Sequence, residues 1–333
     1  MSLGRIKMKR STLSLLAGVF LAAGLFGVQP ANANDFPNKP VSILVPWGPG
    51  GPADLFARGL IEQGAALLKQ PIVILNKPGA SGTLGSSEIF RAKPDGYSLL
   101  LADSISTVFQ PKRLALPYRG YEDFQAIVKL TDVPNILAVS ANSKWKTLND
   151  FVADARNRPG LLRVATAGRY TATDLNILEF NRIAGIDLAT IPSSGGTGQA
   201  MTMVLGNHVE AIIASPASIV GHVSSQTLRP LAVFSNKRIG LFPEVPSTVE
   251  LGYNTTMTNM FYVSAPKNLD PVAMKKLSET FLEVVKSPKW KEMSEKFGLL
   301  LEPLGPQELT ASLEAWNKYF VKFNRDLNIQ PEK

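Results

Sequence analysis

Two stretches of this chain alternate short apolar runs, rich in β-branched residues, with segments whose apolar residues recur at helical spacing. This alternation constrains the fold more than any other feature. In the first stretch it predicts strands at Val41–Pro46, Ile72–Leu75 and Tyr97–Ala102, with helices at Ala53–Leu68 and Thr83–Arg91 between them. A β-loop-α order of this kind is typical of a parallel sheet covered by helices.

The second stretch begins near Asn135 and repeats this order with shorter elements. Thr147–Asp150 resembles a capping box that starts one helix, and Gly185 and Gly206 follow the ends of two others. The expected strands are Asn135–Ser140, Leu162–Thr166, Leu188–Ile191, Val209–Ala214, Leu231–Phe234 and Met260–Ala265, followed by mostly amphipathic helix over Pro271–Leu327 with Leu299–Leu304 as a candidate last strand. We therefore expect two α/β units, and the boundaries near 136 and 260 carry no flexible tether.

The N-terminus has the features of a secretory signal peptide over residues 1–33. Four basic residues precede an uncharged apolar run at Leu13–Val28, and Ala31–Ala33 is a small-residue cleavage site. The alternative is a membrane anchor, which this run disfavours because it is shorter than the roughly 20 residues needed to cross a bilayer. We expect cleavage after Ala33 and export, most simply into a bacterial periplasm. Without the four basic residues, 31 Lys and Arg face 27 Asp and Glu, so the formal charge falls from +8 to +4.

The sequence excludes several classes of protein. The chain has no Cys, so it has no disulfide, thiol nucleophile, zinc ribbon or lipoprotein anchor. The G-x-G-x-x-G and G-x-x-x-x-G-K-S/T phosphate-binding motifs and the G-x-S-x-G nucleophile elbow are absent. His208 falls in a turn and His222 in a helical stretch, and nothing marks either as a catalytic base. Basic residues interleave with acidic ones, so no nucleic-acid-binding face is expected. We expect no catalytic residue, no metal and no cofactor.

Loops rich in Gly, Ser and Thr follow several expected strands, at Trp47–Ala53, Gly79–Gly82, Asp103–Thr107, Gly168–Thr173 and Ser193–Thr197. Open α/β sheets bind ligands at the carboxyl ends of their strands. Backbone N–H groups at the helix N-termini that follow such loops attract anions. We therefore expect a small anion to be held between two sets of loops, one from each unit.

Some side chains beside these loops have more than one interpretation. Asp54 and Arg58 lie four residues apart on a helix and are expected to form an ion pair that supports the preceding loop, with direct ligand contact by Arg58 as the alternative. Arg169 and Tyr170 occupy a loop tip in the second unit. Their side chains either reach the cleft between the two units and contact the ligand, or stay outside it. The ring of Trp47 is interpreted as a wall of the pocket, with a packed surface ring as the alternative.

Five motifs in series resemble one family, the tripartite tricarboxylate transporter substrate-binding proteins, also called the Bug family or TctC-like periplasmic binding proteins. The motifs are Pro46–Arg58 (PWGPGGPADLFAR), Asn76–Gly82 (NKPGASG), Pro94–Leu99 (PDGYSL), Leu205–Val209 (LGNHV) and Phe242–Ser247 (FPEVPS) with Glu250–Tyr253 (ELGY). The resemblance extends over essentially the whole mature chain, in order.

This resemblance implies an α/β fold of the two-lobed periplasmic-binding-protein type (a type II-like Venus flytrap), each lobe a mostly parallel sheet flanked by helices. The first lobe would comprise 34–136 with 261–333, and the second 137–260. The resemblance also implies a protein that captures a small organic acid and delivers it to integral-membrane subunits of a tripartite tricarboxylate transporter. We expect a monomer. Two alternatives stay open: an exported α/β enzyme acting on a carboxylate, and a ligand-presenting sensor protein for a membrane kinase.

The resemblance and the loop positions together give the candidate ligand-binding residues. They are Trp47, Pro49, Gly50, Gly51, Ala53, Asp54, Ser81, Ser104, Arg169, Tyr170, Thr171, Ser193, Ser194, Gly195 and Ser215. The chain departs from the family pattern at Ala53, Tyr170, Ser193 and Asp174. Losing a hydroxyl at Ala53 while gaining Arg169 and Tyr170 favours a larger or aromatic acid.

Overall fold

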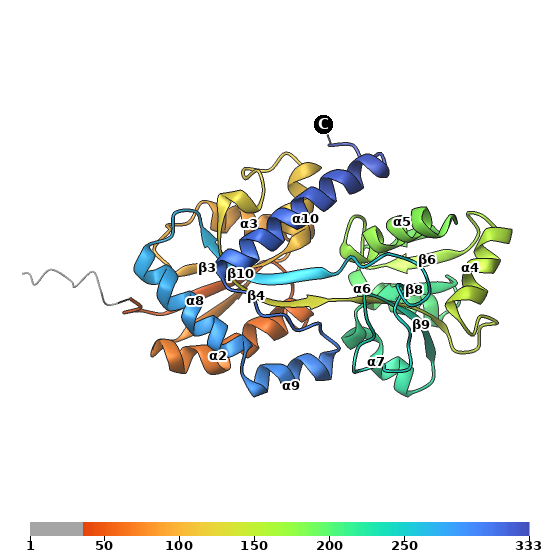
Figure 1. Ribbon diagram of the computed structural model, residues 1–333, viewed down its shortest axis with the longest axis horizontal. Helices are drawn as coiled ribbons and strands as arrows, with labels where there is room; N and C mark the ends of the chain where they lie inside the picture. The colour runs from red at the N-terminus through yellow and green to blue at the C-terminus, as the bar shows by residue number, and fades with distance from the viewer. Residues whose placement is uncertain (1–35, 333) are drawn as a thin grey trace, which may run out of the picture. The chain divides into compact units, whose positions relative to one another are not determined.

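The computed structural model describes residues 36–332, and the predicted signal peptide lies outside them. Within this range the strands form two five-stranded sheets (Figure 1). The first has the order β2-β1-β3-β10-β4. Its strands are β1 (Val41–Val45), β2 (Ile72–Asn76), β3 (Ser98–Asp103), β4 (Phe124–Val133) and β10 (Asn259–Pro266).

Helices cover both faces of the first sheet. They are α2 (Pro52–Leu68), α3 (Thr83–Phe90), α8 (Pro271–Val285), α9 (Pro288–Phe297) and α10 (Pro306–Asp326), with short turns at Ala80–Gly82, Ile105–Phe109, Gln110–Lys112 and Tyr121–Asp123. On one face, Leu44 and Leu100 of the sheet join a buried cluster with Ile89 of α3 and Leu313 of α10. On the other face α2 packs against α8, where Gly64 leaves room for the Phe281 ring.

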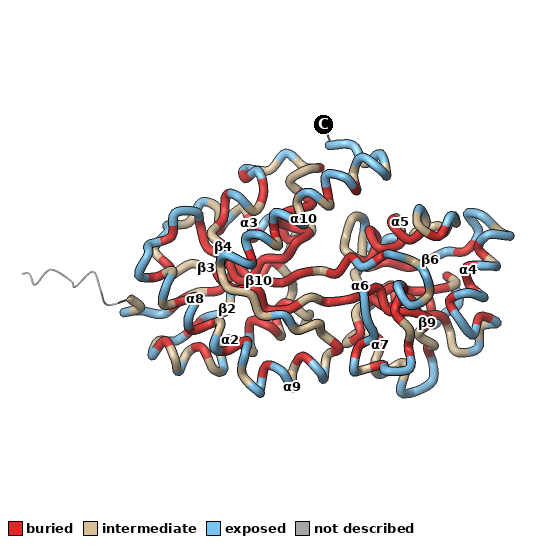
Figure 2. Tube along the Cα trace, in the orientation of Figure 1, coloured by how far each residue is buried: buried red, intermediate tan, exposed pale blue. Residues whose placement is uncertain are grey.

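The second sheet has the order β7-β6-β8-β5-β9. Its elements are β5 (Asn135–Ser140), α4 (Leu148–Asn157), β6 (Arg163–Thr166), α5 (Ala172–Ala184), β7 (Ala189–Pro192), α6 (Gly196–Leu205), β8 (Ala211–Ala214), α7 (Pro216–Ser224) and β9 (Leu228–Phe234). Phe151 of α4 and Phe180 of α5 pack on one face. Met201 of α6 and Ile219 of α7 pack on the other. Figure 2 shows burial concentrated along the strands and exposure along the outer helices.

The expected fold class is confirmed. β1 pairs in parallel with β2 and β3, and β6 pairs in parallel with β7 and β8. In each sheet one strand runs against its neighbours: β10 in the first and β5 in the second. Helix α4 starts at a full capping box, in which Thr147 and Asp150 each accept a hydrogen bond from the other's backbone N–H.

Two strand crossings connect the sheets. The chain leaves through β4, passes Pro134 and enters β5 directly. It returns into β10, which pairs antiparallel with β4 from Asn259–Val133 to Pro266–Phe124. The outgoing and returning strands therefore lie side by side (Figure 1).

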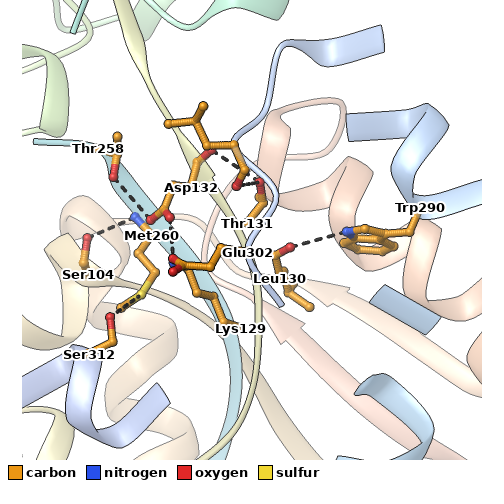
Figure 3. Close-up of polar contacts among 11 residues, drawn as sticks. Ser104, Lys129, Leu130, Thr131, Asp132, Thr258, Met260, Trp290, Glu302 and Ser312 are labelled. Atoms are coloured by element: carbon orange, nitrogen blue, oxygen red, sulfur yellow. Dashed lines mark hydrogen bonds and ion pairs between the residues drawn. The ribbon is translucent and has the colours of Figure 1, made fainter. Parts of the chain in front are cut away.

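A cluster of polar side chains connects the two crossings to Glu302 of the C-terminal segment (Figure 3). The Lys129 ammonium, only 3% exposed, lies 2.7 Å from Asp132 Oδ2 and 2.6 Å from Glu302 Oε2. The Thr258 hydroxyl, just before β10, donates to Asp132 Oδ1 at 3.2 Å. Asp132 therefore contacts both crossings at the point where they leave the first sheet.

Two expectations about strands need correction. β4 is not among the predicted strands, because Lys129 and Asp132 interrupt its apolar pattern. In the structure these two charges pair with each other. The segment Leu299–Leu304 is not a strand: it forms an isolated bridge from Leu300 to Asp132, and the Lys129 N–H donates to Leu304 O. Pro303 has no N–H to donate, so a regular ladder cannot continue there.

Replacing Lys129 by Met should destabilise the protein, because it leaves Asp132, whose side chain is only 14% exposed, without its counter-charge. We expect a loss of about 3–5 kcal/mol in the free energy of unfolding, measured by urea denaturation. The matched control is Lys318→Met, which removes an exposed i,i+4 pair with Glu314 and should cost below about 1 kcal/mol. Equal effects of the two substitutions would contradict a structural role for the buried pair.

Candidate functional site

A cavity of about 610 Å³ lies where loops of the two sheets meet, within the range of about 300–1,000 Å³ usual for small-molecule sites. It opens at the carboxyl ends of β1, β3, β6, β7 and β8 and beside the two crossings. Its lining residues are Trp47, Gly48, Pro49, Gly50, Gly51, Pro52, Ala53, Ile105, Val133, Asn135, Ala167, Thr171, Ala172, Thr173, Gly195, Gly196, Thr197, Gly198, Ser215, Ser218, Asn259 and Phe261.

The first turns of α2, α5, α6 and α7 reach this cavity. The first N–H groups of a helix have no partner within it, and the helix dipole is positive at that end. Among the described residues that line the cavity, none is an Asp, Glu, Lys, Arg or His. An anion held here would therefore be recognised by backbone N–H groups, hydroxyls and amides rather than by a salt bridge.

Asp54 fixes the β1–α2 loop on the first-sheet side. Its buried carboxylate accepts hydrogen bonds from Gly50 N at 3.0 Å, Asn76 Nδ2 at 3.1 Å and Arg58 Nε at 2.8 Å. Burial works to raise the pKa of Asp54, but these hydrogen bonds and the Arg58 charge hold it below its ordinary value. The expected Asp54–Arg58 pair is present, and its role is to shape the loop.

A second buried carboxylate, Asp103, positions Trp47. The indole Nε1–H donates to Asp103 Oδ2 at 3.0 Å, and the N–H groups of Ile105 and Ser106 donate to Oδ1 at 2.9 and 3.0 Å. Burial raises the pKa of Asp103 above its ordinary value despite these bonds. The Trp47 ring is thus held in place as a wall of the cavity, as the sequence analysis expected.

The loops of the second sheet are shaped by their own side chains. Gln199 Oε1 accepts from Gly195 N at 2.7 Å and from the Ser193 hydroxyl at 2.8 Å. Ser215 and Ser218 share a hydrogen bond of 2.8 Å at the start of α7. These contacts fix the backbone of the two helix starts that face the cavity.

The predicted site residues divide into two groups. Those that line the cavity are Trp47, Pro49, Gly50, Gly51, Ala53, Thr171, Gly195 and Ser215. Asp54, Ser81, Ser104, Arg169, Tyr170, Ser193 and Ser194 are outside the lining. The Ser104 hydroxyl lies close behind it, where it contacts Asn259 Oδ1 and Met260 N, both at 3.2 Å. Ser81 lies in a short turn with a φ of 52°, and Ser194 is exposed.

Tyr170 packs against the first sheet's cluster instead of lining the cavity. Its ring lies 4.3 Å from the Arg113 guanidinium carbon and 4.6 Å from that of Arg169. Gln110 Nε2 donates to Tyr170 O at 3.3 Å. The side chain at this loop tip therefore forms a contact between the two halves of the molecule.

Four lining residues contributed by the crossings are not among the predicted site residues: Val133, Asn135, Asn259 and Phe261. Nothing in the local sequence distinguishes them from ordinary strand residues. Gly198 and Ser218, which lie in the first turns of α6 and α7, are also missing from the predicted set. Helix-start geometry is the signal that would have found these two. Over residues 36–332, no group of three or more His, Cys, Asp or Glu side chains is placed to hold a metal ion.

The comparisons with known proteins identify the family. The model described as "Tripartite tricarboxylate transporter family receptor" matches residues 56–311. Protein BugT of Bordetella pertussis is 32% identical over 284 residues, which cover 84% of this chain and 86% of that protein. The chain therefore belongs to the tripartite tricarboxylate transporter receptor family. Its members are periplasmic solute-binding receptors, not enzymes, so the alternative of an exported enzyme is not supported.

Solved structures share the fold. The periplasmic binding protein BugD superposes with a TM-score of 0.78 at 27% identity, covering 89% of this chain and 100% of that one. The R. palustris protein Rpa4515, whose structure was solved with adipate, has a TM-score of 0.81 over 89% of this chain and 100% of its own. At 22% identity, that second likeness shows the fold alone. In the described part of this receptor, no helix has the length and hydropathy required to span a membrane.

Replacing Asp54 by Asn should destabilise this receptor by about 1–3 kcal/mol at neutral pH, because Gly50 and Arg58 lose a charged acceptor. The pKa of Asp54 is lowered in the folded state, so its stabilisation is complete above its ordinary pKa of 3.8 and is lost as the pH falls through the folded-state value. The difference between wild type and variant in the free energy of unfolding, measured with urea, should therefore shrink as the pH falls from 3.8 to the folded-state pKa. A pH-independent difference would contradict the assignment.

Proposed function

We propose that this receptor captures a small organic carboxylate in the cavity between its two sheets and delivers it to the integral-membrane subunits of a tripartite tricarboxylate transporter. Membership of the receptor family supports the transport role. The adipate-bound relative in the same fold supports a carboxylate as the ligand. The cavity itself carries the proposal, since several helix N-termini converge there on a lining without ionisable side chains.

The two sheets serve as two lobes in this proposal, 34–136 with 261–333 and 137–260. Strand crossings at Pro134 and just before Asn259 are their covalent connections. Closure of such lobes around a ligand is a common signalling motion in binding proteins. Trp47, Pro49, Gly50, Gly51 and Ala53 would contact the ligand from one lobe, and Thr171, Gly195 and Ser215 from the other. Asp54, Ser81, Ser104, Arg169, Tyr170, Ser193 and Ser194 would support these loops.

Export is the second part of the proposal. The segment 1–33 directs the chain to the periplasm, and cleavage after Ala33 releases a monomeric receptor. The mature N-terminus, read by mass spectrometry of the protein purified from periplasm, should be Asn34. An uncleaved chain that stays with the membrane fraction would contradict this part.

Equilibrium binding tests the proposed function directly. The exported protein is unfolded and refolded to remove bound ligand, and its melting temperature is screened with mono-, di- and tricarboxylates and with matched neutral amides. A ligand at 1,000 times its Kd adds about 4 kcal/mol, which raises the melting temperature by roughly 8–16 °C at about 2–4 °C per kcal/mol. We expect a shift with at least one acid and none with its amide. A flat screen with every acid would contradict the proposal.

A negative charge placed in the cavity should weaken binding of the acid found in that screen. Gly198 lines the cavity in the first turn of α6, and an added Cβ would meet no atom within 4 Å. An aspartate there is also favourable for the helix N-terminus, so Gly198→Asp should fold normally. Gly198→Asn measures the effect of side-chain size alone. By calorimetry, the aspartate should raise Kd at least tenfold beyond the asparagine, and equal Kd values would contradict the site.

A further inference from the structure

Tyr170, at the tip of the loop between β6 and α5, reaches across from the second lobe to the first. Its ring packs on Phe109, with ring centroids 6.2 Å apart, and lies 4.3 Å from the guanidinium carbon of Arg113. Its carbonyl accepts a hydrogen bond from Gln110 Nε2 at 3.3 Å. All three partners belong to one short stretch of the first lobe. Aromatic pairs and cation–π contacts of this kind stabilise an interface beyond the apolar area that they bury.

Each of the two arginines at this ring has its own counter-charge. Arg113 pairs with Glu332 near the C-terminus, and the Glu332 N–H donates to Arg113 O at 2.7 Å. Arg169, whose guanidinium carbon lies 4.6 Å from the ring, has its Nη1 3.6 Å from Asp174 Oδ2. The two carboxylates reduce the repulsion between the guanidinium groups, so both can lie against one ring. The Arg113 side chain is only 10% exposed, which strengthens its contact with the ring.

The backbone of Tyr170 has a conformation that a tyrosine rarely adopts. Its φ is 56°, in the left-handed region. Such a conformation is costly and persists only where surrounding contacts hold it. Within the second lobe, Asp174 Oδ2 accepts from Tyr170 N at 2.9 Å, and the Thr171 hydroxyl donates to Gly168 O at 2.8 Å. These bonds fix the loop to its own lobe, so the contact of the ring with residues 109–113 is a contact between the two lobes.

This contact is continuous with both walls of the cavity. Thr171, the residue after Tyr170, lines the cavity from the second lobe, and Ile105, in the same turn as Phe109, lines it from the first. An approach of the lobes that encloses a ligand therefore also brings the Tyr170 ring onto its partners. Tyr170, Phe109 and Arg113 are not among the described residues that line the cavity. Their contact can act on a bound acid only through the position of the lobes.

We propose that Tyr170 and Arg113 are positioning residues that hold the two lobes together around the bound acid and thereby slow its release. This inference rests on the proposed function and adds to it two residues outside the cavity that set affinity. The apparent Kd of a ligand falls as the state competent to hold it becomes more populated. A contact made only once the lobes have approached does not help the acid to enter, so it acts mainly on the dissociation rate.

The kinetics of release test this role. The probe is the carboxylic acid that raises the melting temperature most in the screen above. Its association and dissociation are followed by stopped-flow tryptophan fluorescence on the refolded exported protein, because Trp47 lines the cavity. Tyr170→Gly removes the ring and suits the left-handed backbone, so it should fold. We expect its dissociation rate to rise at least about fivefold, with the association rate within about twofold of the wild type.

The outcomes separate this inference from the proposed function. A dissociation rate of Tyr170→Gly within about twofold of the wild type would overturn the inference and leave the proposed function intact. Binding of no acid by the wild type would contradict both. Tyr170→Phe is the matched control, because it keeps the ring and removes only the hydroxyl. It should release the acid at the wild-type rate, and an acceleration equal to that of Tyr170→Gly would also overturn the inference.

A double-mutant cycle distinguishes a contact between the lobes from a local change in the loop. Arg113→Met removes the guanidinium from the first lobe and should accelerate release at least about threefold in the wild type, but hardly at all in Tyr170→Gly. Glu332→Gln removes only the ion pair at that guanidinium and should keep the wild-type rate. Independent, multiplicative effects of Arg113→Met and Tyr170→Gly would overturn the inference. Circular dichroism confirms that each variant is folded.

Discussion

The antiparallel pairing of β4 with β10 is the constraint on which the rest of the structure depends. The chain leaves the first sheet on β4 and returns to it on β10, so these adjacent strands carry both connections to the second sheet. Asp132 contacts both connections through Lys129 and Thr258. Because the crossings leave from one edge region, the carboxyl ends of β1 and β3 lie opposite those of β6, β7 and β8, and the cavity forms there.

The charged side chains near this cavity form hydrogen bonds and ion pairs with other protein groups. The lining itself has no ionisable side chain among the described residues. Asp54 organises the β1–α2 loop, and Asp103 holds the indole of Trp47. The Arg169 guanidinium stacks on Tyr170 and lies 3.6 Å from the Asp174 carboxylate. Buried carboxylates that accept several hydrogen bonds fix backbone geometry strongly. What remains for a ligand is a lining of backbone N–H groups, hydroxyls, amides and apolar side chains.

Local patterns in the sequence were enough to predict most of the fold. Apolar runs such as Val41–Val45 and the glycine that ends α5 at Gly185 depend on short-range chemistry, which a single sequence carries. β4 could not be predicted in this way, because Lys129 is acceptable in a buried strand only where a distant Glu302 and a nearby Asp132 surround it. In the same way, Leu299–Leu304 has strand-like composition but meets β4 at an edge without regular pairing.

The candidate site was predictable where glycine-rich loops precede helices, as at Gly50, Gly51 and Gly195. Arg169 and Tyr170 lie on such a loop, yet Tyr170 packs on Phe109 and Arg113 across the molecule, a contact that only the tertiary structure determines. Asn259 and Phe261 reach the cavity only because β10 crosses there. Positions on crossing strands carry no sequence signal of their own.

A crystal structure of the receptor with the acid found in the binding screen tests the central claim most directly. The account predicts the acid in the cavity between the two sheets, with its carboxylate oxygens within hydrogen-bond distance of backbone N–H groups or hydroxyls of the lining residues. An acid bound outside this cavity would contradict the account.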